Sequence, residues 1–405
     1  MDIRKKITLV VLLLIVIGSI WYLESIKVRP TTAPGGDRTI NIGASPNVTS
    51  SASSGARNSR NNASIVLSAA TQTALAQIAA ADKAAGDQPA IEIADPTGFI
   101  NASSGFTLSS LIGNKVVLLD FWTYSCINCV RTIPYLNAWY QKYVDEGLVI
   151  VGIHTPEFDF EKNLTNVQNA VREYGIQYPV ILDSDQGTWN AYNNLYWPHE
   201  YLIDIAGYIV HDQVGEGSYG ETETDIQKLL AQRTQVLGTS ALAIATSTVN
   251  IPSPNLSDVN SPETYFGAAR NNLLANGAIF SNGNQTLTAP AADAIELNKL
   301  YLDGAWDFED QYATNLGAGA TITYKYDAGN VYFVAASPMG TTVDVLQDGQ
   351  PISAADAGSD VHGGKVIISG NRLYNLVKNA NGGGVHTLQL KVETPGLQAY
   401  TFTFG

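Results

Sequence analysis

The stretch Lys115-Val-Val-Leu-Leu-Asp-Phe-Trp-Thr-Tyr-Ser-Cys-Ile-Asn-Cys129 decides how this chain folds. It begins with a nearly continuous apolar run, typical of a buried parallel strand, that only Asp120 interrupts. Cys126 and Cys129 follow the strand and open a helical stretch. A second apolar strand at residues 148–154 completes the unit. The pattern therefore predicts two parallel strands joined by a helix.

The elements that follow continue an α/β domain. Apolar residues at helical spacing over 167–174 predict an amphipathic helix, and residues 180–182 predict a short strand. Residues 200–214 read as a hairpin around an Ala-Gly turn, and residues 222–232 as a closing helix. We expect a three-layer α/β domain over residues 89–237.

The C-terminal third of the chain has a different pattern. After a Ser-, Thr-, Pro- and Asn-rich linker at residues 238–260, short alternating strands such as 321–326 and 386–392 are separated by Gly and Asn turns. Asp348-Gly349 is a favourable hairpin turn. These features predict an all-β sandwich, jelly-roll-like, over residues 261–405.

The N-terminus carries the signals of a membrane anchor. Three basic residues at positions 4–6 precede an uncharged apolar run, Ile7–Leu23, close to the shortest span of about 17 residues. We expect residues 1–24 to form a single transmembrane helix with a cytoplasmic N-terminus and extracytoplasmic domains; a cleaved signal peptide is the alternative. Residues 25–88 then form a flexible tether, whose Ala-rich end at 68–86 is a short helix or further stalk.

Charge and cysteine content exclude several classes of function. The formal net charge of −14 argues against a nucleic-acid partner, because the phosphate backbone would be repelled. The chain of 405 residues contains only two cysteines, both in one Cys-x-x-Cys motif. No cysteine is left for a structural disulfide, so the pair is expected to do chemistry.

The Cys-x-x-Cys motif predicts thiol-disulfide exchange. Cys126 lies at the positive end of the predicted helix, where a thiolate is favoured, so it is the expected nucleophile. Cys129 is the expected resolving thiol, close enough to close the disulfide. Half of a zinc site is the alternative, but the sequence has no second cysteine pair and no His pair at ligand spacing. We therefore expect no metal and no cofactor beyond the redox-active disulfide.

Two carboxylates are candidates for proton transfer. Asp120 shares a strand face with Leu118 and Trp122, where partial burial would suit it to exchange a proton with Cys129. A strand-end carboxylate that simply reaches water is the alternative. Glu157 follows the neighbouring strand, whose carboxyl end opens on the same edge, and is either a second acid/base group or a solvated loop residue.

The residues around the two cysteines resemble those of a known family. Asp120–Cys129, with Pro134 in the helix, resembles the active-site strand and helix of thioredoxins. The match is closer to the extracytoplasmic thioredoxin-like domain of DipZ-type proteins, and it extends from about residue 89 to residue 405, since those proteins also carry a carbohydrate-binding-module-like β domain. The segments that carry this resemblance are 122–136, 154–158, 196–198 and 201–204.

The resemblance implies roles for particular residues. Pro198 looks like the cis-proline beside the active-site disulfide, and we assign substrate contacts to Trp122, Trp197 and Pro198. Glu157 resembles the active-site glutamate of TlpA and ResA proteins. The family implies reduction of protein thiol/disulfide substrates, with a role in cytochrome c maturation. DipZ proteins add a multi-span electron-conducting membrane domain, in place of which we expect one helix here. A separate membrane donor of CcdA type is thus implied.

Two other functions compete with this one. A thiol peroxidase would fit the Thr-x-x-Cys spacing that ends at Cys126, although Asp120 stands where its upstream proline is expected. A cell-envelope binding protein with an accessory redox domain would use the β domain to hold a glycan or a protein. Trp306, Tyr324, Tyr326, Tyr332 and Tyr374 could line a sugar platform, although aromatic residues on sheet faces more often belong to the core.

Overall fold

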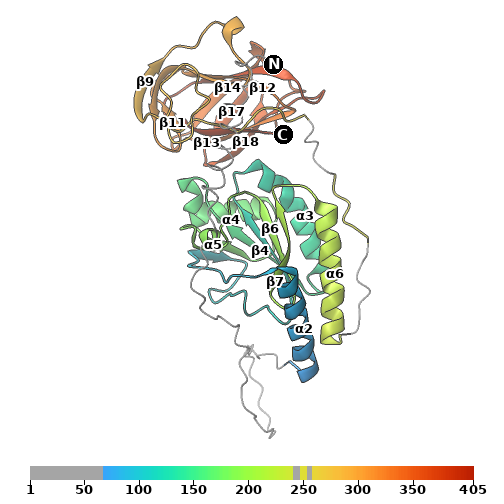
Figure 1. Ribbon diagram of the computed structural model, residues 1–405. Helices are drawn as coiled ribbons and strands as arrows, with labels where there is room; N and C mark the ends of the chain where they lie inside the picture. Colours follow the sequence, from blue (N-terminus) through green and yellow to red (C-terminus); the bar gives the residue numbers. More distant parts are fainter. Residues whose placement is uncertain (1–66, 240–246, 253–257) are drawn as a thin grey trace, which may run out of the picture. The chain divides into compact units, whose positions relative to one another are not determined.

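A computed structural model of the protein describes residues 67–239, 247–252 and 258–405 (Figure 1). The anchor expected at residues 1–24 lies outside these residues. Among the described residues, no helix is both long enough and apolar enough to cross a membrane.

The Ala-rich end of the expected tether is a helix, α2 (Ala69–Ala85). The hydroxyl of its N-cap, Ser68, accepts a hydrogen bond from the N–H of Thr71 at 3.1 Å. The helix ends at Gly86, whose φ of 97° is a left-handed conformation that glycine adopts without strain. Of the two alternatives for this stretch, the structure has the helix.

The first domain, residues 88–237 and hereafter the redox domain, is built on a seven-stranded sheet of order β1-β7-β6-β3-β4-β5-β2. The central strands β3, β4 and β5 are parallel, and β6 and β7 form the expected antiparallel hairpin. The strands are β1 (Gln88–Pro89), β2 (Gly98–Ile100), β3 (Val116–Trp122), β4 (Leu148–His154), β5 (Val180–Leu182), β6 (His199–Ile203) and β7 (Tyr208–Val214).

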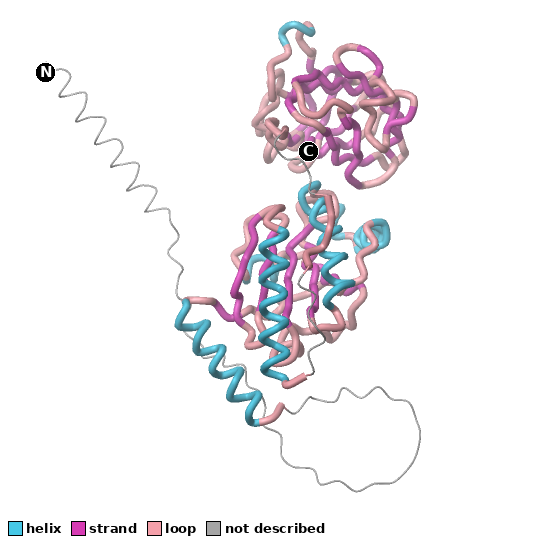
Figure 2. Tube along the Cα trace, turned by 90° about the vertical axis from the view of Figure 1, so that its right-hand side faces the viewer, coloured by secondary structure: helices cyan, strands magenta, loops and turns pink. Residues whose placement is uncertain are grey.

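Helices run alongside these strands (Figure 2) and make the domain α/β, as predicted. One apolar core joins α3, α4 and α6 to one face of the sheet, and a second core joins α5 to the other face. The helical segments are α3 (Ile127–Tyr143), the 3₁₀ turn η1 (Asp159–Lys162), α4 (Leu164–Glu173), α5 (Gly187–Ala191) and α6 (Tyr219–Leu237).

Strand β3 positions the site. All seven of its residues are buried, because the strand lies in the middle of the sheet with a core on each face. Side chains alternate along a strand, so Val117 and Phe121 enter one core while Leu118 and Trp122 enter the other. Asp120 therefore shares the face that α3 covers, which is the face of the Cys-x-x-Cys helix.

The C-terminal part, residues 261–405 and hereafter the β domain, is all-β, as predicted. Strand β10 continues from one half of its sheet to the other: its first residues pair with β12 and its last with β9 and β11. The jelly-roll form stays a prediction. The strands are β8 (Thr264–Tyr265), β9 (Gly283–Leu287), β10 (Leu300–Phe308), β11 (Ala313–Asn315), β12 (Thr321–Asp327), β13 (Asn330–Ala336), β14 (Thr341–Gln347), β15 (Gln350–Pro351), β16 (Val361–His362), β17 (Lys365–Ile368), β18 (Arg372–Lys378), β19 (Val385–Val392) and β20 (Gln398–Phe404).

Of the two readings of the β-domain aromatics, a sugar platform or core, the structure has the core. Trp306, Tyr324, Tyr326 and Tyr374 are all fully buried in the core of this domain, and only Tyr332 is half-buried. Large aromatic side chains on the inner faces of strands fill the core, because they bury the most apolar area there. The turn at Asp348-Gly349, in contrast, joins β14 to β15 as predicted, with φ values of 52° and 76°.

Candidate active site

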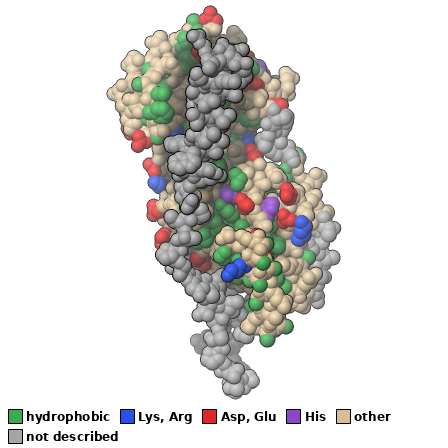
Figure 3. Space-filling model, in the orientation of Figure 1, with side chains coloured by type: hydrophobic (Ala, Val, Ile, Leu, Met, Phe, Trp, Pro, Cys, Tyr) green, Lys and Arg blue, Asp and Glu red, His purple; other side chains and the backbone are tan. Residues whose placement is uncertain are grey.

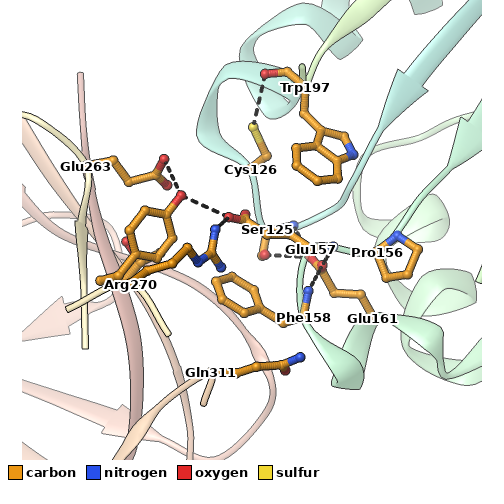
Figure 4. A network of polar contacts seen from close by, with 12 residues as sticks. Ser125, Cys126, Pro156, Glu157, Phe158, Glu161, Trp197, Glu263, Arg270 and Gln311 are labelled. Carbon is orange, nitrogen blue, oxygen red and sulfur yellow. Dashed lines mark hydrogen bonds and ion pairs between the residues drawn. The ribbon is translucent and has the colours of Figure 1, made fainter. Parts of the chain in front are cut away.

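The two cysteines differ sharply in their surroundings. Cys126 is the N-cap of α3 and is half-buried, whereas Cys129, in the first turn, is 1% exposed. Both are free thiols in the structure. The Sγ atom of Cys126 lies 3.9 Å from the carbonyl oxygen of Trp197 (Figure 4). Only Cys126 is therefore in a position to meet another protein's disulfide.

The loop before β6 lies against Cys126. Its Trp197–Pro198 peptide bond is cis, as the resemblance implies. The indole of Trp197 stacks on Trp189 with ring centroids 4.2 Å apart, and its Nε1 donates to the carbonyl of Thr155 at 3.0 Å. The carbonyl group that faces Cys126 thus belongs to a residue whose indole ring is held in place by a stacking contact and a hydrogen bond.

Trp122 lies beneath the site rather than on its surface. It is fully buried, and its ring meets His154 edge to face at a centroid distance of 5.0 Å. Burial lowers the pKa of His154 to about 3, so this imidazole is neutral at ordinary pH. Trp122 and His154 end the parallel strands β3 and β4 and form the floor of the loops that carry the site.

Asp120 and Cys129 occupy the same buried layer. Asp120 is 1% exposed, and burial raises its pKa to about 8. Burial also raises the pKa of Cys129, with smaller contributions from Cys126 and from the charge of Asp120. A carboxyl group with a pKa near neutrality can both take and return a proton, as the buried thiol requires.

Glu157 is joined to the β domain. Its Oε1 accepts hydrogen bonds from Arg270 Nη1 at 2.7 Å and from the hydroxyl of Tyr265 at 2.9 Å. Figure 4 shows this carboxylate turned toward Arg270. The same Tyr265 hydroxyl lies 2.8 Å from Oε2 of Glu263, so its single proton is donated to one of the two carboxylates at a time. The loop after β4 is therefore held by polar groups from both domains.

Sequence reasoning missed Glu161, which lies in η1 four residues after Glu157. It is fully buried and accepts hydrogen bonds from Ser125 Oγ at 2.6 Å and from the N–H of Glu157 at 2.7 Å. Burial is the largest influence on its pKa and raises it to about 7. Glu161 thus ties the residue before Cys126 to the loop after β4. The loop sequence has no periodicity that could have indicated which carboxylate turns inward.

Glu200 was also missed. It lies in β6, is 3% exposed, and pairs in register with Asp120 of β3. Burial, followed by the charge of Asp120, holds its pKa well above the ordinary value. The signal that identified Asp120, a carboxylate inside an apolar strand, was also present at Glu200.

Arg131 connects the Cys-x-x-Cys motif to its surroundings. Its Nη2 donates to Asn128 Oδ1 at 2.6 Å, inside the motif, and its Nε donates to Glu216 at 2.8 Å. Its Nη1 reaches the carbonyl of Phe404, at the end of the β domain, at 3.4 Å. One guanidinium thus holds the dipeptide between the cysteines and contacts both domains.

Potential metal ligands form no cluster in the described part of the chain. Within residues 67–239, 247–252 and 258–405, no group of three His, Cys, Asp or Glu side chains could hold a metal ion. Figure 3 shows one face of the protein on which Lys and Arg side chains are few and scattered.

Two family models match the chain. The first, described as the AhpC/TSA family, matches residues 87–212, and the second, described as a thioredoxin-like C-terminal domain, matches residues 261–405. Together they cover most of the redox domain and all of the β domain.

Named relatives extend this comparison. Protein DipZ of Mycobacterium tuberculosis is 37% identical over 312 residues, which are 76% of this chain and 42% of DipZ. This chain therefore spans less than half the length of DipZ. Thiol-disulfide oxidoreductase YkuV of Bacillus subtilis is 30% identical over 145 residues, covering 36% of this chain and 96% of YkuV. ResA of Bacillus thuringiensis, also a thiol-disulfide oxidoreductase, is 30% identical over 133 residues, covering 31% of this chain and 74% of ResA.

Proposed function

Because this chain belongs to the thioredoxin-like thiol-disulfide oxidoreductases, we propose that it reduces disulfides of extracytoplasmic proteins while its N-terminal segment holds it to the membrane. The observation that carries the proposal is the asymmetry of the two thiols. Cys126 is open to a partner beside Trp197, and Cys129 is buried in the layer of Asp120.

The exchange proceeds in two steps. The accessible Cys126 reacts first and the buried Cys129 second. The Cys126 thiolate attacks one sulfur of the substrate disulfide, so that a mixed disulfide forms and the other substrate sulfur leaves as a thiolate. Cys129 then gives its proton to the buried carboxylate of Asp120, and the resulting thiolate attacks Cys126. The mixed disulfide breaks, the Cys126–Cys129 disulfide forms, and two electrons have passed to the substrate.

The direction of electron flow rests on how the reduced pair is held. Strong oxidants of this fold owe their potential to a stabilised reduced form, in which the thiolate is favoured. Here the hydrogen-bond partner of Cys126 Sγ is the carbonyl oxygen of Trp197, an acceptor, and burial, with smaller contributions from Cys126 and Asp120, raises the pKa of Cys129. Burial thus favours the thiol form of Cys129, which supports a reducing pair.

The redox potential tests this proposal. The protein is equilibrated in glutathione buffers, and its oxidised fraction is read from the mass added by alkylation. We expect a potential below about −200 mV, in the range of reductants of this fold. A potential near about −120 mV, that of a strong oxidant, would reverse the assigned direction.

The electron donor and the pathway follow from the family resemblance. A membrane protein of CcdA type is the proposed donor, and the substrates are proposed to include proteins of cytochrome c maturation. Loss of the reduced form of this protein in cells that lack such a donor is the expected result. An unchanged reduced fraction would point to another source of electrons.

Neither competing function gains a specific observation in its favour among the described residues. Thr123, which a peroxidase would use beside the sulfur, is fully buried, and Asp120 replaces the expected proline. Peroxide consumption by the purified protein would distinguish a peroxidase. A glycan-binding role loses the platform assigned to it, since Trp306 and Tyr324 are core residues.

A further inference from the structure

Two acidic side chains face each other inside the redox domain. Asp120 of β3 and Glu200 of β6 are directly opposite in an antiparallel pair, and such residues project from the same face of the sheet. They are 1% and 3% exposed. The Oδ1 atom of Asp120 and the Oε2 atom of Glu200 are both buried, and neither has a hydrogen-bond partner among the described residues.

The groups around this acid pair leave its negative charge unbalanced. In β4 the residue beside Asp120 is Gly152, which has no side chain, and in β7 the residue opposite Glu200 is the uncharged Gln213. Charge on Asp120 or Glu200 contributes to the raised pKa of three titratable groups: Cys129 of α3, Tyr178 before β5, and Tyr219 of α6. None of these three supplies a positive charge at neutral pH.

Two carboxylates that share a dry site cannot both ionise readily, because each negative charge raises the cost of the other. Burial raises the pKa of Asp120, while burial and then the charge of Asp120 raise that of Glu200. Near neutral pH the pair is therefore expected to hold at least one proton. It titrates as a unit rather than as two independent acids.

We propose that Asp120 and Glu200 act as one acid pair that shares a single proton, with Glu200 as the positioning residue that keeps Asp120 able to take and return the proton of Cys129. In the resolving step the thiol proton of Cys129 moves to the ionised carboxylate of the pair. The two carboxyl groups together then hold two protons. The Cys129 thiolate attacks the sulfur of Cys126, the bond between Cys126 and the substrate sulfur breaks, and the substrate sulfur leaves as a thiolate. The acid pair afterwards loses one proton to solvent. The inference concerns this step in either direction of electron flow, so it goes beyond the proposed function.

The test compares Glu200→Gln, Asp120→Asn and the double variant in the full chain. The readout is the rate at which Cys129 resolves a preformed mixed disulfide between Cys126 and a model thiol, from about pH 5 to about pH 9. We expect Glu200→Gln to slow resolution about tenfold and to move its pH midpoint lower, because a neighbouring like charge is gone. The double variant should be no slower than Asp120→Asn, since Glu200 acts through Asp120.

Asp204 offers a matched control at the opposite end of the same strand. It follows β6, is 1% exposed, and accepts hydrogen bonds from the N–H groups of Ala206 and Tyr208, in the hairpin turn away from Cys129. Asp204→Asn should keep the wild-type pH profile while lowering the unfolding temperature. The infrared band of a protonated carboxyl group, present in the wild-type protein near neutral pH, should weaken in Glu200→Gln and stay in Asp204→Asn.

Two results would overturn the proposal. The first is a folded Glu200→Gln protein that resolves the mixed disulfide with the wild-type rate and pH profile. The second is a double variant whose loss is the product of the two single losses, because independent effects would mean that Glu200 only supports the fold.

Discussion

The Nη1 atom of Arg270, in the β domain, lies 2.7 Å from Oε1 of Glu157, in the redox domain. The same guanidinium lies 3.7 Å from the ring centre of Tyr265 and 5.3 Å from that of Phe158. Glu157, which the resemblance placed at the active site, is thus bound to a cation from the other domain. Its side chain is only 10% exposed, so this ion pair is better shielded than an ordinary surface pair.

Replacing Arg270 by Met should therefore destabilise the protein. The change keeps much of the packing on Tyr265 but leaves Glu157 without its cation, and we expect a loss of about 1–2 kcal/mol in the free energy of unfolding. Urea denaturation measures it. Lys228→Met removes an exposed ion pair with Asp225 and should change stability by less than about 0.5 kcal/mol. Equal losses in the two variants would mean that the Glu157 pair has no special role.

The thiols should differ in reactivity. Cys126 is half-buried at a helix N-terminus, whereas Cys129 is 1% exposed and burial raises its pKa. In the reduced protein we expect iodoacetamide to modify Cys126 well before Cys129, as followed by peptide mass spectrometry. Equal rates at the two positions would contradict their assignment as nucleophile and resolving thiol.

Burial of Asp120 should make stability fall as pH rises. Its pKa is raised from an ordinary value of 3.8 to about 8, so between these values the folded state holds a proton that the unfolded state has lost. Stability attributable to this residue is therefore highest below about pH 4 and declines toward pH 8, by at most about 1.4 kcal/mol per pH unit. Asp120→Asn should flatten this decline in urea titrations. An unchanged slope would mean that Asp120 is ionised in the folded protein.

We expect the redox domain and the β domain to be accessible from outside the cell. The apolar run Ile7–Leu23 follows a basic N-terminus, which should remain in the cytoplasm. Protease added to intact spheroplasts is expected to remove everything beyond the tether and to leave a short membrane fragment. Protection of the redox domain under these conditions would refute the topology, provided that a known external protein is digested in parallel.

Much of the redox domain could be predicted from local pattern. The apolar strand before Cys126 and the apolar run at residues 148–154 specify a parallel pair, because a continuous apolar strand needs cover on both faces. Asp120 was identified as buried by the same logic, since a lone carboxylate in such a strand shares the strand's burial. The structure has both features.

The inward position of Glu161, the pairing of Glu200 with Asp120 and the core position of the β-domain tyrosines depend on tertiary contacts that no local pattern encodes. Glu161 rather than Glu157 turns inward because Ser125 and two backbone N–H groups receive it, and those partners meet only in the folded loop. Glu200 becomes half of an acid pair through the register of β6 against β3. Tyr324 and Tyr326 are two residues apart and so lie on one face of their strand, which could be either a core face or a binding face. In the folded domain this face belongs to the apolar core.

Trapping the mixed disulfide shows whether Asp120 receives the proton of Cys129 in the resolving step. Asp120→Asn keeps the size and shape of the side chain but cannot take the proton, and general acid/base assistance is worth about 10²–10⁴-fold. The protein is turned over on a model disulfide, quenched in acid, and the fraction joined to substrate through Cys126 is measured by mass spectrometry. We expect this fraction to rise in Asp120→Asn while the first attack keeps its rate. Turnover at the wild-type rate with no accumulated mixed disulfide would mean that Asp120 does not receive the proton.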